Sequence, residues 1–388
     1  MAKYKLEEIF DLQMGKTPSR NNLEYWNTCD NKWISIGDLS QAGKYISDTK
    51  EYLSNSAVEE SKIKVIPANT VVMSFKLSIG KTAITSEDMY SNEAIMAFHD
   101  KHVIELMPEY MYYMFKYKSW DEGTNKAVMG KTLNKAILSK VEIEVCSIEK
   151  QKEIVELLDK VSEILDKRKA ELQKLDTLIR ARFVEMLGDP NINSKKWNEC
   201  PLSKKLNVLG GYAFKSDQFD EKGGIPVLRI GNINAGYFKP VNMVYWQKDE
   251  NLEKYAMYPG DLVMSLTGTV GKDDYGNVCI LNDDYEMYYL NQRNAKLEIK
   301  EGIDKYYLSQ LLKFEQIKKR LTGISRGVRQ ANISNKDILN LVVPIPPLEL
   351  QNQFADFVRA VDKSKVEVQK ALGKTQMLFD SLMQQYFG

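Results

Sequence analysis

Two long stretches of this chain carry apolar residues at the spacing of a coiled coil. In residues 148–188 and again in 347–388, apolar side chains recur at intervals of three and four positions over five heptads. This spacing predicts two long helices, each with an apolar stripe that packs along another helix. The predicted seam positions are Ile154, Leu158, Val161, Leu165, Leu172, Leu175 and Ile179 in the first helix, and Phe354, Val358, Val361, Val368, Leu372, Phe379 and Leu382 in the second.

Polar residues interrupt both stripes, at Arg168, Arg182, Lys365 and Thr375. One interpretation is that the long side chains lie along the edge of the seam and keep their charged ends in water. The other is that these polar positions determine which helix pairs with which, and in what register. The pattern alone leaves both interpretations open.

The remaining segments, 1–147 and 189–346, have a mixed pattern. Short β-type runs such as Thr70–Ser74 and Leu262–Ser265 are separated by Gly, Asn and Asp turn signals. A helical pattern follows in each segment, near Tyr110–Ser119 and near Tyr306–Lys318. Each segment is therefore predicted to be an α/β domain within an α+β protein.

The two halves of the chain repeat one plan. Ile34–Leu39 (ISIGDL) returns as Leu228–Ile233 (LRIGNI), and Pro67–Ser74 returns, one residue shorter, as Pro259–Ser265. A Gly-Lys pair lies six residues beyond each of these serines, at Gly80 and at Gly271. Because each half ends in a predicted long helix, the expected domains are 1–147, 148–188, 189–346 and 347–388.

Composition excludes several kinds of site but does not by itself indicate a particular one. The net charge is only +1, so a nucleic-acid footprint must come from local clusters. The four cysteines, Cys29, Cys146, Cys200 and Cys279, are too scattered for a zinc site, and His99 and His102 are the two histidines of the sequence. The charged start of the chain and the lack of an apolar run of about 18 residues lead us to expect a cytoplasmic protein.

Catalytic signatures are absent from the sequence. Gly-Lys-Thr occurs four times, but the position five residues before each glycine holds Phe10, Phe75, Asn125 or Val368 rather than the glycine of a phosphate-binding loop. The double proline Pro346-Pro347 is not followed by the aromatic residue of an amino-methylating signature. The adjacent carboxylates Asp273-Asp274 and Asp283-Asp284 are typical of solvated turns. We therefore expect no catalytic residues and no bound metal.

Several motifs in order resemble one known family. The first half carries GKTPSRNNLEYW (15–26) and KWISIGDL (32–39); the second carries IPVLRIGNI (225–233), MSLTGTVGK (264–272), NQRNAKL (291–297) and VPIPPLELQ (343–351). The first half departs from the last motif, with EVCSIEKQ (144–151) and no prolines. This arrangement, duplicated with a helix after each copy, resembles the specificity subunits of type I restriction-modification systems.

The resemblance implies a non-catalytic subunit with two target-recognition domains at opposite ends of an antiparallel coiled coil. Each domain would read one half of a bipartite, asymmetric DNA site. The helices would form the platform for two DNA methyltransferase subunits and, through them, restriction motor-nuclease subunits. S-adenosylmethionine, ATP and magnesium would belong to those partners. The alternatives are a stand-alone DNA-modifying enzyme with an unrecognised active site, and a homologue that binds only a protein partner.

Basic clusters at matching places support DNA binding. Lys313–Lys336 holds seven basic residues against one acidic residue, and Lys116–Lys140 holds six against two. Residues that differ between the halves are candidates for base reading or phosphate contact, although each could instead serve a turn, a helix cap or a strand pair. The candidates are Ser19, Arg20, Asn21, Lys76, Ser78, Lys81, Lys126 and Lys131 in the first domain, and Lys215, Ser216, Arg229, Thr267, Thr269, Lys272, Arg326, Arg329 and Gln330 in the second.

Overall fold

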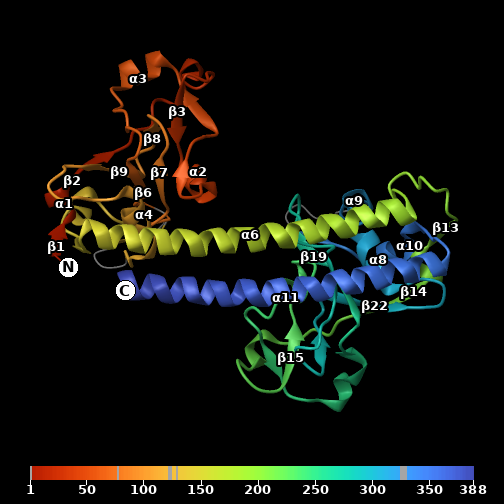
Figure 1. Cartoon of the computed structure of the whole chain (residues 1–388). Coiled ribbons are helices and arrows are strands. Elements are labelled where there is room, and N and C mark those ends of the chain that lie inside the picture. Colours follow the sequence, from red (N-terminus) through yellow and green to blue (C-terminus); the bar gives the residue numbers. More distant parts are fainter. Residues whose placement is uncertain (1, 77, 121–124, 128–129, 324–329) are drawn as a thin grey trace. The chain divides into compact units, whose positions relative to one another are not determined.

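The computed structural model describes residues 2–388 apart from 77, 121–124, 128–129 and 324–329. The chain divides by its internal contacts into two compact units. Unit 1 comprises Met1–Lys169 with Lys370–Gly388, and unit 2 comprises Ala170–Gln369. Two long helices, α6 (Ile148–Leu187) and α11 (Leu348–Phe387), each contribute one stretch to unit 1 and another to unit 2 (Figure 1).

Unit 1 is built on a five-stranded sheet with the order β2-β9-β6-β7-β4, a three-stranded sheet with the order β5-β3-β8, and the pair β1-β12. Its strands are β1 (Ala2–Lys5), β2 (Phe10–Met14), β3 (Asn31–Ile34), β4 (Tyr45–Ile46), β5 (Glu51–Leu53), β6 (Val71–Ser74), β7 (Thr82–Thr85), β8 (Tyr90–Ser91), β9 (Ile95–Asp100) and β12 (Glu142–Val145). Strands β6 and β7 are buried at every position, as expected of strands covered on both faces.

Unit 2 repeats most of this topology. Its four-stranded sheet has the order β14-β22-β18-β20, a second sheet has the order β16-β15-β21-β17, and β13 pairs with β24. The strands are β13 (Glu199–Pro201), β14 (Leu206–Gly210), β15 (Ile225–Leu228), β16 (Tyr245–Trp246), β17 (Ala256–Met257), β18 (Leu262–Ser265), β20 (Val278–Ile280), β21 (Tyr288–Leu290), β22 (Asn294–Ile299) and β24 (Val342–Pro344). The parallel pair β3-β8 of unit 1 returns as β15-β21, so the sequence repeat is a repeat of the fold.

Both units also contain short helices. They are α1 (Leu6–Ile9), α2 (Ile36–Gln41), α3 (Asn55–Ser61), α4 (Pro108–Tyr117), α5 (Lys135–Leu138), α7 (Ile230–Ile233), α8 (Lys305–Leu312), α9 (Glu315–Thr322) and α10 (Asn335–Asn340), with 3-10 turns η1 (Leu23–Tyr25), η2 (Leu202–Lys204), η3 (Ser216–Gln218) and η4 (Glu250–Tyr255). The helical pattern predicted over 306–318 is divided into α8 and α9. Phe314 breaks it because its backbone is extended and its ring is buried 4.8 Å from that of Phe183.

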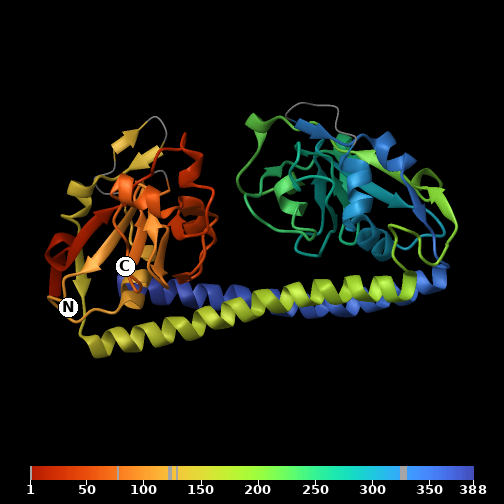
Figure 2. The ribbon, with the colours of Figure 1, turned by 90° about the horizontal axis from the view of Figure 1, so that it is seen from above.

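Each unit packs one face of its larger sheet and a covering helix against its stretch of the long helices (Figure 2). In unit 2, the Phe183 ring of α6 lies 5.5 Å from Tyr307 of α8 and 5.2 Å from Phe354 of α11. In unit 1, Leu158 of α6 and Met383 of α11 are buried in the same cluster as the sheet residues. A fully buried side chain of this size contributes about 1.5–3 kcal/mol, so these contacts bind the helices firmly to each domain.

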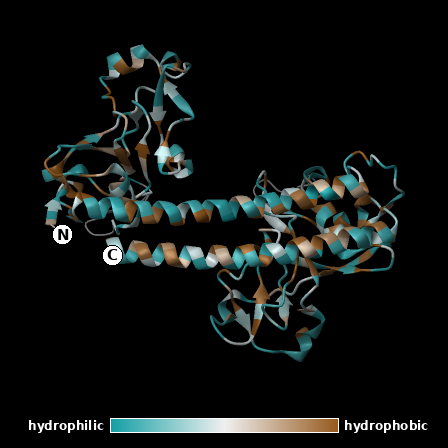
Figure 3. Ribbon diagram, in the orientation of Figure 1, coloured by the Kyte–Doolittle hydropathy of each residue, from teal (hydrophilic) through white to brown (hydrophobic). Residues whose placement is uncertain are grey.

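The long helices pair antiparallel within each unit. Arg168 contacts Ala371 and Thr375 while Leu158 shares a core with Met383 in unit 1, and Asp176 pairs with Lys365 in unit 2. All fourteen predicted seam residues are buried or half-buried, and Figure 3 shows apolar residues recurring among polar ones along both helices. Two repeated α/β domains with a packed pair of long helices confirm the predicted fold class.

All four polar seam residues make a contact with the opposite helix. The Arg168 guanidinium donates hydrogen bonds to the Ala371 carbonyl and to Thr375 Oγ1. The Lys365 ammonium lies 2.6 Å from Asp176 Oδ1, and the Arg182 guanidinium lies 5.8 Å from the Phe357 ring. These cross-helix contacts favour a role in pairing and register over side chains that only lie along the edge of the seam.

Candidate nucleic-acid interface

The central strand of each domain ends at a fully buried serine that closes a turn. In unit 1, the Ser74 N–H donates to Lys81 O at 2.9 Å, and Ser74 Oγ accepts from the Lys81 N–H at 3.1 Å. In unit 2, Ser265 makes the same two bonds to Asn277, at 2.9 and 3.1 Å. Lys81 therefore corresponds to Asn277, and Gly80 corresponds to Gly276, which shares its positive φ.

This correspondence corrects the predicted repeat. Gly271 does not match Gly80, because seven positions separate Ser74 from Lys81 whereas twelve separate Ser265 from Asn277. The equal spacing from each serine to a Gly-Lys pair was misleading. The insertion in unit 2 places Gly271-Lys272 at the same distance from Ser265 as Gly80-Lys81 is from Ser74, whereas the structural counterpart of Gly80 is Gly276. Lys272 is thus an exposed residue of a longer loop rather than the counterpart of Lys81.

The longer loop of unit 2 begins with a strand of a two-stranded ribbon. Strand β19 (Thr267–Thr269) pairs antiparallel with β23 (Gln330–Asn332), so that Thr269 lies opposite Gln330. The loop then turns, with the Lys272 N–H donating to Thr269 O at 3.0 Å. The fold therefore brings four candidates together: Thr267, Thr269, Lys272 and Gln330. The candidates Arg326 and Arg329 lie outside the described residues.

Unit 1 has a ribbon at the corresponding place, built differently. Its strands are β10 (Asn125–Ala127) and β11 (Gly130–Thr132), which pair with each other and set Lys126 opposite Lys131. Both ribbons are joined to the turn in the same way. The Leu133 N–H donates to Phe75 O at 3.0 Å, and the Ile333 N–H donates to Leu266 O at 2.8 Å. The two domains thus present different ribbons on a common base.

Arg20 is engaged within its own domain. Its guanidinium pairs with both carboxylate oxygens of Glu51, the second contact at 3.0 Å, and lies 3.7 Å from the Trp26 ring and 4.8 Å from the Trp33 ring. The carbonyl of Ser19 accepts a hydrogen bond from Trp26 Nε1 at 3.1 Å. This arrangement supports the structural alternative for Ser19 and Arg20, whereas Asn21 is exposed.

The other candidates of unit 1 lie around the short turn. Lys76 is half-buried beside the Phe75 ring, and Ser78 is exposed while its carbonyl accepts from Ser74 Oγ. The Lys81 ammonium donates to Ser40 Oγ of α2. In unit 2, the candidates Lys215, Ser216 and Arg229 are exposed, the first two at the start of η3 and the last before α7.

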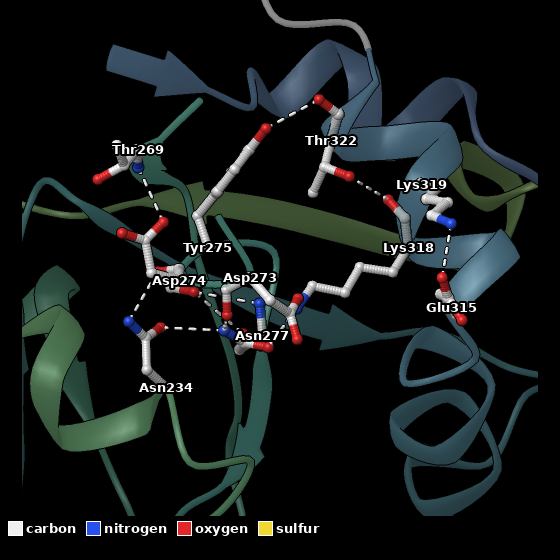
Figure 4. Close-up of polar contacts among 11 residues, drawn as sticks. Asn234, Thr269, Asp273, Asp274, Tyr275, Asn277, Glu315, Lys318, Lys319 and Thr322 are labelled. Atoms are coloured by element: carbon white, nitrogen blue, oxygen red, sulfur yellow. Dashed lines mark hydrogen bonds and ion pairs between the residues drawn. The ribbon is translucent and has the colours of Figure 1, made fainter. Parts of the chain in front are cut away.

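A cavity of about 760 Å³ lies beneath the long loop of unit 2. Its lining includes four lysines, Lys272, Lys313, Lys318 and Lys319, against two carboxylates, Asp273 and Glu315. Figure 4 shows Lys318 extending from α9 toward Asp273 and Asn277 of the loop. The Thr269 N–H donates to Asp274 Oδ1 at 2.8 Å and lowers the pKa of that carboxyl. The local excess of positive charge suits an anionic ligand.

Other features bear on catalytic alternatives. Within the described part of the chain, no cluster of three or more His, Cys, Asp or Glu side chains could hold a metal ion. His99 is half-buried, with Nε2 3.2 Å from Gln13 Oε1, and desolvation lowers its pKa. Burial raises the pKa of the Cys279 thiol to about 12. Across the same described residues, each helix is too short or too polar to traverse a bilayer.

Sequence reasoning missed two glutamines that attach the long helices to the domains. Gln151 accepts from the Met107 N–H at 2.9 Å and donates to Glu105 O and Cys146 O. Gln351 accepts from the Asp304 N–H at 2.8 Å and donates to Pro346 O at 2.7 Å. Both side chains are fully buried, and Met107 and Asp304 are the N-cap residues of α4 and α8. The signal was present, because the two aligned motifs SIEKQ and PLELQ both end in these glutamines.

Comparison with known proteins agrees with this geometry. The pattern of the type I restriction modification DNA specificity domain matches twice, over residues 1–175 and 194–375. The MjaIX type I restriction enzyme specificity subunit of Methanocaldococcus jannaschii is 23% identical over 402 residues, covering 98% of this chain and 90% of that protein. The MjaVIII specificity subunit of the same organism is 25% identical over 334 residues, or 78% of this chain and 75% of the relative.

A solved structure shares the fold. The crystal structure of the type I restriction-modification system S subunit from M. genitalium superposes with a TM-score of 0.57 at 17% identity, covering 100% of this chain and 96% of that one.

Proposed function

We propose, because the chain belongs to the type I restriction modification DNA specificity family, that it is the sequence-specific DNA-binding subunit of such a system. In this proposal, residues 1–147 and 189–346 are target-recognition domains, each reading one half of a bipartite, asymmetric DNA site. Residues 148–188 and 347–388 are the helices that join them and offer a platform to partner subunits.

One observation carries the proposal: two copies of one α/β frame present different ribbons at the same place. The frame is common because β2-β9-β6-β7 of unit 1 and β14-β22-β18-β20 of unit 2 have the same strand order. The ribbons differ because the turn after Ser265 is longer than the turn after Ser74. Two readers with a common frame and different ribbons fit a DNA site made of two unlike halves.

The ribbon of unit 2 suits base reading in its two-stranded form and in its residue types. The major groove of B-DNA is about 12 Å wide and admits a two-stranded ribbon. Thr267, Thr269 and Gln330 occupy paired ribbon positions, and threonine and glutamine can hydrogen-bond to base edges. The exposed lysines Lys272 and Lys319 would contact phosphates, which provide affinity without sequence information.

The chemistry of the system would belong to partner subunits. We propose two DNA methyltransferase subunits that bind S-adenosylmethionine, and restriction subunits that use ATP and magnesium. The stand-alone enzyme is the weaker alternative, because the family to which the chain belongs is one of DNA specificity proteins.

A selection experiment tests the DNA-reading proposal. The full chain, alone and with methyltransferase subunits, is incubated with a random pool of duplex DNA, and the retained sequences are determined. We expect a motif of two short unlike halves with a fixed gap. Replacing residues 1–147 with the matching domain of a homologue should change one half and leave the other. A single undivided motif, or both halves changing in a folded hybrid, would contradict the proposal.

The enzyme alternative needs its own assay. The purified chain is mixed with duplex DNA, labelled methyl donor, ATP and magnesium. We expect neither label transfer nor cleavage until partner subunits are added. Turnover by a pure sample of this chain would support a stand-alone enzyme instead.

A further inference from the structure

Lys318 directs its charge inward, toward the long loop of unit 2. It extends from α9, its side chain is only 12% exposed, and its ammonium pairs with Asp273. The same nitrogen donates to Asn277 Oδ1 at 2.5 Å (Figure 4). A lysine that contacts phosphates would be expected to keep its donors free for solvent or DNA. Lys318 instead uses two of its three donors on the loop.

A continuous set of hydrogen bonds leads from this lysine to the ribbon. Asn277 Nδ2 donates to Asn234 Oδ1 at 3.3 Å, and Asn234 Nδ2 donates to Asp274 O at 2.7 Å. Asp274 Oδ1 in turn accepts from the Thr269 N–H at 2.8 Å. The position of Lys318 is thus linked to the end of β19, where the loop begins its exposed turn.

The base of the loop has a separate attachment. Tyr275 is buried, and its hydroxyl donates to Thr322 O at 2.8 Å. Gly268 is packed so closely on Asp274 and Tyr275 that a Cβ there would overlap both. These contacts hold the base of the loop without Lys318, so the loss of Lys318 would loosen residues 270–274 and leave the domain folded.

In unit 1, an apolar contact supports the corresponding turn. There the shorter turn at Gly80 packs against the indole of Trp120, which is buried and donates from Nε1 to Phe115 O at 2.9 Å. The five extra positions in unit 2 extend the loop beyond such support. A charged side chain from α9 supplies it instead, and this makes the Lys318 contact specific to the second domain.

We propose that Lys318 is a positioning residue that determines specificity for the second half-site. Its ammonium holds residues 270–274 so that Thr269 and Lys272 meet the DNA in one fixed geometry, and Lys318 itself does not contact DNA. The inference rests on the proposed function. Its physical basis is preorganisation: a loop ordered before binding loses less conformational entropy when the DNA arrives.

Three variants isolate this role. Lys318→Met keeps the buried methylenes and removes the charge, Lys318→Arg restores the charge, and Lys319→Met removes an equal charge from a more exposed lysine that pairs with Glu315 on its own helix. The probes are the duplex that wild type selects from the random pool and an unrelated duplex of the same length. Hydrogen exchange over residues 267–277 is measured without DNA.

We expect Lys318→Met to raise exchange in residues 270–274 and to weaken binding to the selected duplex by about tenfold, the cost of about one misread base pair. The preference for particular bases should weaken in the second half-site only. The affinity for the unrelated duplex should be unchanged, and so should the slope of affinity against salt concentration. Lys318→Arg should restore most of the preference. Lys319→Met should keep the preference, even if it lowers affinity for every duplex.

Other outcomes overturn the inference. If Lys318→Met weakens both duplexes equally and lowers the salt slope by about one, Lys318 is a phosphate contact. If exchange of the loop is unchanged, or both half-sites relax along with a general loss of stability, positioning is wrong. A normal wild-type motif in these cases leaves the proposed function standing. A wild type that selects no motif contradicts the proposed function itself, and with it the inference.

Discussion

Replacing Gln351 with methionine tests how the long helices hold their domains. Gln351 is fully buried at the fourth position of α11. Its carbonyl accepts from the Asp304 N–H at 2.8 Å, and its amide donates to Pro346 O at 2.7 Å. Asp304 caps α8, which carries Tyr307 into the core against Phe183. The glutamine thus joins three segments of unit 2 through two backbone groups.

The magnitude follows from those two groups. Methionine has similar length and volume, so little packing is lost, but the Asp304 N–H and the Pro346 carbonyl lose their partner. Each buried polar group left unsatisfied costs about 1–3 kcal/mol. We therefore expect the free energy of unfolding of unit 2 to fall by about 3 kcal/mol. For a domain of this size that corresponds to a Tm lower by about 6–12 °C.

The matched control is Gln353→Met, because Gln353 is exposed two positions along the same helix. Thermal unfolding gives the loss of stability, and hydrogen exchange of peptides around Asp304 locates it in unit 2. Gln151→Met should have the same effect in unit 1 around Met107. If Gln351→Met unfolds within about 0.5 kcal/mol of the Gln353 control, the glutamine bonds are replaceable and the reasoning fails.

Two further predictions concern the helix seam and the cysteines. Arg168→Leu should change the free energy of unfolding by less than about 1 kcal/mol, because leucine extends the apolar stripe. Without the polar residue the helices can also pair in other ways, so light scattering should detect more than one oligomeric species. A single species would show that Arg168 does not determine pairing. At pH 8, a thiol reagent should label the exposed Cys29 at once but should label Cys279 only as the protein unfolds. Burial raises the pKa of the Cys279 thiol to about 12 and keeps it protonated. Equal labelling rates of the two cysteines, measured by peptide mass spectrometry, would contradict the burial.

The architecture was predictable from sequence because its signals are periodic and repeated. The seam residues recur at heptad spacing over many turns, and such a pattern has few other physical explanations. The β-runs ending at Ser74 and Ser265 could be matched because buried strands are uniformly apolar. The division of 306–318 into two helices was not visible, since Phe314 fits a helical pattern and only its place in the core makes it break the helix.

The candidate interface was predictable only in part. Residue type alone suggested Arg20, but no local pattern indicates that Glu51, 31 positions away, pairs with its guanidinium, or that the Trp26 and Trp33 rings lie against it. Lys318 was counted within a basic cluster without a distinct role, because its partner Asp273 lies 45 positions away. Contacts of this kind depend on which strands become neighbours, and that information is absent from windows of sequence.

The cost of lengthening a loop and the cost of losing a buried glutamine differ in size. This difference explains how two similar domains can present different ribbons. Lengthening the turn from seven positions to twelve raises the entropic cost of loop closure by only about 0.5 kcal/mol, since that cost grows with the logarithm of length. Removing a buried glutamine such as Gln351 costs about 3 kcal/mol, because two backbone groups lose their partner. Changes in the exposed loop are therefore several-fold less destabilising than changes in the contacts that hold helix to domain. Each half must keep these contacts to remain folded, while the ribbons are free to differ, and a protein that reads two unlike half-sites needs this combination.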